Sequence, residues 1–133
     1  MTRKMLKFNP ELSEQLGKRI LECGFTPDIR KMFGHEVFFM SGYMFCGANV
    51  EGAFFNVGEI LKEEFLSTEK HVAPFTPVEG MAMKDYIQVD MSVCADAKNF
   101  KKWITTSGNY LLSLPPKRKK PKKKRPSPAG PPR

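Results

Sequence analysis

The sequence predicts an α+β domain of two layers, in which an antiparallel sheet packs against helices in the order helix, three strands, helix, one or two strands, helix. In three segments of residues 1–114, apolar residues recur with the period of a helix. Between them lie short apolar or alternating runs, bounded by turn signals, which is the pattern of strands. Hydrophobic residues make up 41% of the chain, and nearly all of them precede Pro115, so residues 1–114 can bury a core as one domain.

The first predicted helix covers residues 9–25. Asn9 can accept hydrogen bonds from the free N–H groups of the first turn, and Pro10 suits the first helical position. Gly24 favours the left-handed conformation that ends a helix, which would let Phe25 pack on the last turn. The face toward the core would carry Leu12, Leu16 and Ile20.

Three strands are predicted next, at residues 31–40, 43–49 and 53–57, which are rich in aromatic residues and methionine. Ser41-Gly42 is the signal of a two-residue hairpin, and residues 49–52 (NVEG) are the signal of a second hairpin. Short strands joined by tight turns form an antiparallel meander.

Residues 57–66 return to helical spacing, and residues 67–80 are predicted as a loop because two prolines interrupt them. Residues 85–91 alternate between apolar and polar side chains, as a half-buried strand does. The helical face toward the core would carry Val57, Leu61 and Phe65.

The last predicted helix runs from about residue 96 to residue 114, where two prolines end it. Gly108 weakens this helix by about 1 kcal/mol relative to alanine. Its apolar stripe consists of Phe100, Trp103, Ile104, Ser107, Tyr110, Leu111 and Leu114.

Charge divides the chain into a domain, residues 1–114, and a tail, residues 115–133. The chain has 22 Lys and Arg against 14 Asp and Glu, and nine of the basic residues lie in the tail, which has no acidic residue. The domain therefore has 13 basic and 14 acidic residues, and the excess of positive charge belongs to the tail. Three widely spaced cysteines argue against a disulfide framework and favour a reducing compartment. No apolar run is long enough for a membrane span or a secretory signal.

Residues 30–58 (RKMFGHEVFFMSGYMFCGANVEGAFFNVG) resemble the N-terminal domain of the TfoX (Sxy) family of competence regulators. Later segments look like that family's Pro-Phe…Met…Tyr segment, at Pro74, Phe75, Met83 and Tyr86, and like its closing helix. The motif residues that carry the resemblance are Arg30, Lys31, Met32, Phe33, Gly34, Gly42, Met44, Phe45 and Trp103.

The resemblance covers about residues 12–117 and implies the same α-β(3)-α-β(2)-α fold in two layers. His35 and Glu36 depart from the smaller residues expected in the first hairpin. We expect no second domain like that of full-length competence regulators, so the role of that domain is not carried over.

The sequence predicts neither an enzyme nor a metal or cofactor site. Its histidines and cysteines lack metal-ligand spacing, and nucleophile-elbow and phosphate-loop motifs are absent. The alternative is a small enzyme with a pocket around His35 or His71. The Met-Phe-Gly hairpin either presents Arg30, Lys31 and His35 rigidly beside an apolar strand, or is a strand whose Met32 and Phe33 fill the core. The methionines also allow two interpretations, because flexible apolar side chains can form an adaptable binding surface or fill the core. They are Met32, Met40, Met44, Met81 and Met83.

The tail is predicted to be an extended, disordered arm that binds nucleic acid without reading its sequence. Like charges and seven prolines exclude a helix or a core, and at ~3.1 Å per residue the arm would reach on the order of 60 Å. Without aromatic residues it can contact phosphates but cannot stack on bases. The candidate nucleic-acid-binding residues are Lys117, Arg118, Lys119, Lys120, Lys122, Lys123, Lys124 and Arg125.

The resulting hypothesis is an accessory or regulatory factor that its tail tethers to nucleic acid. The alternatives are a protein-interaction module, homodimeric or binding a partner through its sheet, and a tail that only solubilises the chain, contacts anionic surfaces in general or is a nuclear address. A local basic patch in the domain would consist of Arg30, Lys31, Lys98, Lys101 and Lys102, which otherwise form solvated faces. We expect no membrane contact, no small-molecule substrate, and a location in the cytoplasm or on the nucleoid, or in the nucleus of a eukaryotic source.

Overall fold

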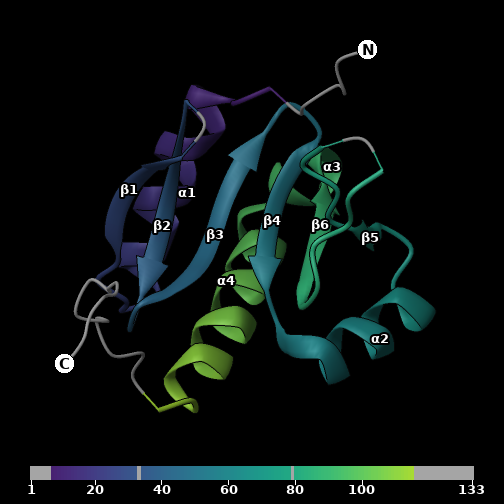
Figure 1. The fold of residues 1–133 in the computed structure, drawn as a ribbon. Coiled ribbons are helices and arrows are strands. Elements are labelled where there is room, and N and C mark those ends of the chain that lie inside the picture. The colour runs from purple at the N-terminus through teal and green to yellow at the C-terminus, as the bar shows by residue number, and fades with distance from the viewer. Residues whose placement is uncertain (1–6, 33, 79, 116–133) are drawn as a thin grey trace, which may run out of the picture.

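The computed structural model describes residues 7–32, 34–78 and 80–115. These residues form an open antiparallel sheet of six strands in the order β1-β2-β3-β4-β6-β5 (Figure 1). The strands are β1 (Asp28–Met32), β2 (His35–Met40), β3 (Tyr43–Asn49), β4 (Gly52–Asn56), β5 (Val72–Pro74) and β6 (Tyr86–Asp90). The helices are α1 (Pro10–Glu22), α2 (Gly58–Thr68), α3 (Met91–Cys94) and α4 (Ala97–Leu112). The α+β class is thereby confirmed.

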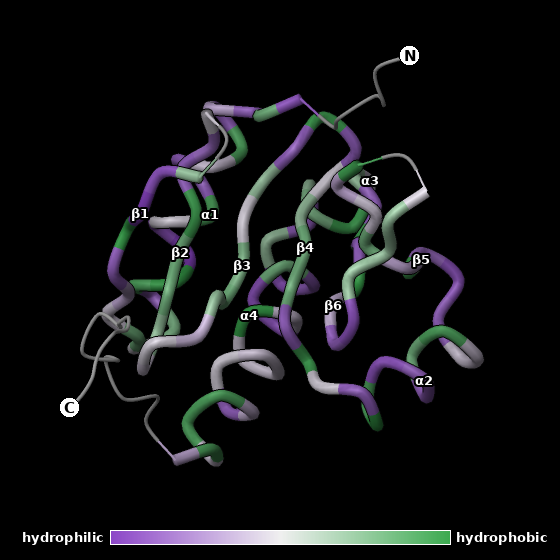
Figure 2. Tube along the Cα trace, viewed as in Figure 1, coloured by the Kyte–Doolittle hydropathy of each residue, from purple (hydrophilic) through white to green (hydrophobic). Residues whose placement is uncertain are grey.

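One face of the sheet carries the main core. Helix α1 packs on β3 and on α4, and α4 packs on β3 and β4, so both helices lie behind the sheet in Figure 1. In Figure 2, β2 is mostly apolar, whereas the outer strand β1 is mostly hydrophilic. The largest side chains that are fully buried include Phe45, Phe55, Phe100, Leu16, Ile20, Ile87, Ile104 and Leu111.

The ends of α1 are those predicted. Oδ1 of Asn9 accepts a hydrogen bond from the N–H of Leu12 at 3.1 Å. At the other end, the N–H of Phe25 donates to the carbonyl of Ile20 at 3.2 Å, which closes the helix with the hydrogen bond of a Schellman motif. The predicted apolar stripe of this helix is buried.

The number of strands before α2 is four, not three, which corrects the prediction for residues 31–40. Met32 pairs with His35, so the chain reverses direction between these two residues. Gly34 has φ +82, a left-handed conformation that a two-residue turn requires and that glycine adopts without strain. The run KMFGHEVFFM is therefore a hairpin, and β1 begins upstream of it at Asp28.

The two other predicted hairpins are confirmed. Ser41 and Gly42 both have positive φ, as in a type I′ turn, and they connect β2 to β3. Asn49 pairs with Gly52, and the turn between these two residues connects β3 to β4. The two strands implied after α2 are β5 and β6, and β5 lies inside the segment predicted as a loop. The structure adds the short helix α3 after β6.

Gly108, predicted as a weak point of the last helix, is where that helix touches the end of α1. A Cβ atom at this position would lie 2.4 Å from the ring of Phe25. The ring of Phe25 in turn packs edge-on against Phe45, with 5.9 Å between the ring centroids. The glycine therefore lowers helix propensity but permits the contact that joins α1, α4 and the sheet.

None of the helices in the described part of the chain is long and apolar enough to cross a membrane.

Candidate functional site

The face of the sheet opposite α1 and α4, here called the open face, is covered by a loop and not by a helix. Residues 75–78 and 80–85, here called the strap, run in front of β4 and β6 in Figure 1. A second apolar cluster lies on this face, centred on Val37, Phe54 and Phe75. Its partly buried members are Met32, Phe39, Met44, Met83 and Tyr86.

The strap is attached to the sheet by Phe75, which packs on Phe54, which in turn packs on Gly47. The ring of Phe54 lies over Gly47 of the neighbouring strand, where a Cβ atom would come within 2.6 Å of it. The ring of Phe75 stacks on Phe54, with 4.1 Å between centroids and 10° between the planes. The strap is held further by Lys62 of α2, whose Nζ donates to the carbonyl of Met83 at 2.9 Å.

A buried polar group joins β3, β4 and β6 beside this stack. The hydroxyl of Tyr86 donates to the carbonyl of Met44 at 3.1 Å, and Nδ2 of Asn56 donates to the same carbonyl at 3.3 Å. Burial raises the pKa of Tyr86, so its phenol stays protonated and remains a donor. Within the described residues, Oδ1 of Asn56 is buried without a hydrogen-bond partner.

The motif residues serve different parts of the fold. Met32 and Met44 pack in the open-face cluster, whereas Phe45 and Trp103 are buried in the main core. The two motif glycines, Gly34 and Gly42, lie in turns. Phe33 lies outside the described residues.

The predicted basic patch divides between two elements. Arg30, on β1, places its guanidinium 4.4 Å from the ring centroid of Phe39, and the adjacent Lys31 points to the other face of the sheet. The three lysines of α4 lie on a helix that packs on β3 and β4: Lys98, Lys101 and Lys102. Lys101 is engaged with Glu22 of α1, with 3.1 Å between Nζ and Oε1. The five residues therefore do not form one patch.

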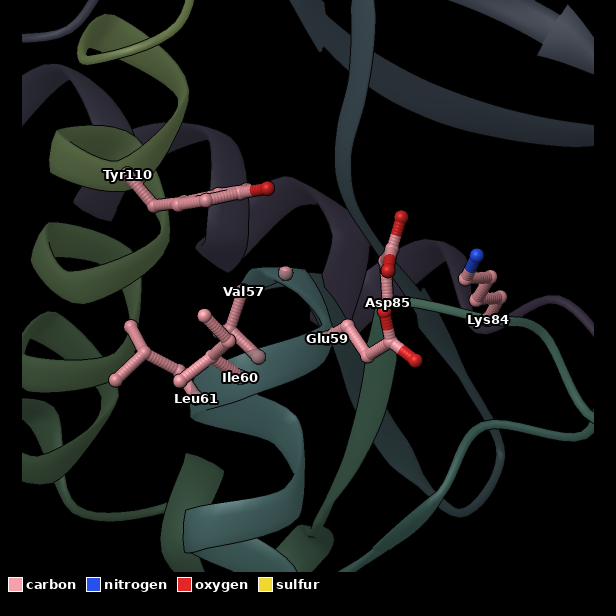
Figure 3. Close-up of a pocket in the computed structure, with 8 residues that line it drawn as sticks. Val57, Glu59, Ile60, Leu61, Lys84, Asp85 and Tyr110 are labelled. Atoms are coloured by element: carbon pink, nitrogen blue, oxygen red, sulfur yellow. The ribbon is translucent and has the colours of Figure 1, made fainter.

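A cleft of about 520 Å³ opens where the start of α2 meets α4 and the end of the strap (Figure 3). The carbonyl of Asp85 accepts hydrogen bonds from the N–H groups of Val57 and Gly58, which holds the strap end against the helix. Tyr110 lies across Gly58, and partial burial followed by the charge of Asp85 raises the pKa of Tyr110. Glu59 and Lys84 complete the polar rim.

His35 and His71, the two histidines considered for an enzyme pocket, lie in separate parts of the fold. His71 lines an open cleft of about 440 Å³ that also contains Asp90. The hydroxyl and N–H of Ser92 donate to the Asp90 carboxylate and lower its pKa, so this carboxylate acts as the cap of α3. His35 is half-buried, with its ring centroid 5.4 Å from that of Phe8.

The cysteines do not assemble with these histidines. Cys46 and Cys94 are buried in the main core, and burial raises the pKa of both thiols, that of Cys94 to about 12. Cys23 contacts α4, where the hydroxyl of Thr105 donates to its Sγ at 3.6 Å. Among the described residues, no group of three or more His, Cys, Asp or Glu side chains is placed to hold a metal ion.

The model of the TfoX N-terminal domain matches residues 26–109. The chain belongs to the TfoX N-terminal domain family. Comparisons with curated proteins and with solved structures gave no match. The family range contains the sheet, the strap and most of α4, and the family is not one of known enzymes. It is narrower than the expected residues 12–117, because α1 and the end of α4 lie outside it.

The tail residues predicted to bind nucleic acid, 117–125, lie outside the described residues, as does the rest of the tail after Pro115. The last described residue is Pro115, whose carbonyl accepts a hydrogen bond from the hydroxyl of Tyr43 at 2.8 Å. The tail therefore begins beside the hairpin that connects β2 and β3.

Sequence reasoning missed the residues that organise the open face, above all Gly47, Asn49 and Gln88. The two amide side chains are buried and hydrogen bonded to each other. The sequence signal was weak, because Gly47 interrupts an apolar strand but Asn49 belongs to a turn signal and Gln88 occupies a polar position of an alternating strand. Such residues need a close contact or a polar partner when they are buried.

Proposed function

We propose that this TfoX N-terminal domain protein is an accessory or regulatory factor that its basic tail tethers to nucleic acid without sequence selection. The observation that carries the proposal is the division of charge. Nine of the 22 basic residues lie in residues 115–133 with no acidic residue, whereas residues 1–114 have 13 basic and 14 acidic residues. Attraction to a polyanion therefore has its source in the tail.

The start of the tail supports this division of roles. Tyr43 holds the carbonyl of Pro115, so the basic run begins at a fixed point on the domain beside the β2–β3 hairpin. Each lysine or arginine that contacts a phosphate releases condensed counterions, which gives an affinity that falls steeply with salt. The domain remains free to contact another molecule while the tail is bound.

The test is fluorescence anisotropy with a labelled DNA duplex and a labelled single-stranded RNA. The full chain is compared with a chain that ends at Pro115, which keeps the Tyr43 contact, and with a full-length variant in which the tail cations become glutamine. We expect only the parent to bind, with a log–log salt slope of about −0.9 for each phosphate contacted in a duplex. Equal binding by all three would make the domain the nucleic-acid reader and would refute the proposal.

A second candidate function is that of a protein-interaction module. It is favoured by the open face, where Met32, Phe39 and Met44 are only partly buried and no helix of the described chain covers them. Its signature would be capture of a purified partner by the chain that ends at Pro115, at about 0.5 M salt, where tail contacts are screened. Loss of capture on Phe39→Ser, with nucleic-acid binding unchanged, would assign the contact to this face.

A further inference from the structure

Strand β1 is the longer of the two edges of the sheet. Its inner side pairs with β2 over five residues, and no described residue pairs with its outer side. Met32 and His35 flank a two-residue turn, so they form a hydrogen-bonded pair, and alternation directs the main-chain groups of Ile29 and Lys31 outward. The edge therefore presents N–H and C=O groups that can pair with another strand.

Exposed apolar side chains flank this edge on the helix side of the sheet. Ile29 is 60% exposed and pairs with Phe38 of β2. The ring of Phe38 meets α1 at Gly17, with 3.3 Å to a Cβ built there, and Leu21 lies one turn further along the same side of α1. Leu21 is 61% exposed, so Leu21 and Ile29 are among the most exposed large apolar residues of the described chain.

Charges on the open-face side select one register for a partner strand of the same sequence. Asp28 and Arg30 lie on the same side of β1, and neither forms an ion pair within the described residues. If two copies pair antiparallel about Ile29, Asp28 of each lies opposite Arg30 of the other. Registers centred on Arg30 or Lys31 instead place like charges opposite each other, which is unfavourable.

We propose that β1 pairs antiparallel with β1 of a second copy of this chain, with Ile29 opposite Ile29. The pairing joins the two six-stranded sheets into one, covers both exposed Ile29 side chains and places the two Leu21 residues along one seam. Two Asp28–Arg30 pairs close the opposite side. Because a single five-residue strand buries little surface, the dimer is weak and reversible.

The register is tested by exchanging charges in the full-length chain. Sedimentation velocity from about 5 to about 500 µM should show a monomer–dimer equilibrium in the parent. Asp28→Arg and Arg30→Asp, which each place like charges opposite, should weaken association about tenfold or more. The double variant, which restores opposite charges, should recover dimerisation. Lys31→Glu is the matched control, because this register places Lys31 opposite Pro27, and it should leave association unchanged.

A cross-link provides a readout that does not depend on affinity. Across a hydrogen-bonded pair the two Cα atoms lie about 5.5 Å apart, which is within reach of a disulfide. In a Cys23→Ser background, Ile29→Cys should therefore form a covalent dimer under mild oxidation, and Lys31→Cys should form it far more slowly. Circular dichroism of each variant confirms that a loss of dimer is not a loss of fold.

Three results would overturn the proposal. The first is a monomer at every concentration with no Ile29→Cys cross-link, and the second is a dimer that both single charge reversals leave intact. The third is slow hydrogen exchange of the Ile29 and Lys31 amides that is independent of concentration and is lost when the tail cations are neutralised, because the tail would then cover the edge. The anisotropy experiment is separate, since tail binding to nucleic acid does not require the dimer.

Discussion

Asn49 and Gln88 exchange two side-chain hydrogen bonds inside the sheet. Nδ2 of Asn49 donates to Oε1 of Gln88 at 3.0 Å, and Nε2 of Gln88 donates back to Oδ1 of Asn49 at 3.1 Å. Oδ1 of Asn49 also accepts the N–H of Glu51, so the same side chain orders the turn before β4. Both residues are more than 90% buried, which makes each the necessary partner of the other.

Gln88→Leu should lower the free energy of unfolding by about 1–3 kcal/mol, because it leaves the amide of Asn49 buried without its partner. Urea unfolding of the full chain measures the change. The control is Gln15→Leu on the exposed side of α1, which should stay within about 0.5 kcal/mol of the parent. If both variants unfold at the same urea concentration, the amide pair does not stabilise the sheet.

Gly108→Ala should destabilise the domain by about 1–3 kcal/mol, although alanine is the better helix former, because the new methyl group would overlap the ring of Phe25. Thermal unfolding tests this, with Asn109→Ala on the exposed side of the same helix as the control. Phe25→Leu should restore part of the loss in the Gly108→Ala background. A more stable Gly108→Ala variant would show that α1 and α4 do not approach closely at this point.

Phe75→Ala should release the strap from the open face and cost about 3 kcal/mol, since the stacked ring on Phe54 is lost. Hydrogen exchange should show the amide of Met83, which donates to the carbonyl of Phe75, accelerating more than the amide of Leu111 in α4. Thr76→Ala, one residue along, is the control. Equal acceleration at both amides would mean that the strap and the main core unfold together.

The stability of the domain should fall as pH rises from about 9 toward 12. The pKa of the Cys94 thiol is raised from 9.0 to about 12 by burial, so in this range the unfolded chain loses a proton that the folded chain retains. One such group contributes at most ~1.4 kcal/mol per pH unit. Urea unfolding at about pH 8 and pH 10.5 should show a shallower decline for Cys94→Ala than for the parent. An identical decline in both would assign the effect to other groups.

Local patterns were sufficient for the three longer helices and for two of the hairpins. Asn9, the apolar stripe of α1 and Gly24 act within a few residues of each other, and the turn at Ser41-Gly42 follows from its own backbone conformation. The family resemblance implied a hairpin between Met32 and His35, but residues 31–40 were predicted as one strand because a continuous apolar run has the appearance of one strand. Two strands were implied after the second helix, but the position of β5 was not predicted because it is three residues long and contains a proline.

The candidate functional surfaces could be predicted less well from the sequence than the secondary structure. The sequence placed Arg30 and Lys31 in one motif, but neighbouring residues of a strand point to opposite faces, and the α4 lysines lie on a different element. Nothing local indicates that the ring of Phe54 lies over Gly47 or that Phe75 stacks on it, because these contacts join segments far apart in the chain.

The linear chain alone determined the ends of α1, two of the hairpin turns, the α+β class and the concentration of charge in residues 115–133, since each depends on composition or on neighbours within a few residues. The tertiary structure decided that β1 is an edge strand with Ile29 exposed, that one face of the sheet is covered by the strap, and that Tyr43 holds Pro115. These properties depend on strand order and on contacts over more than 20 residues of sequence, which the periodicity of a single segment does not encode.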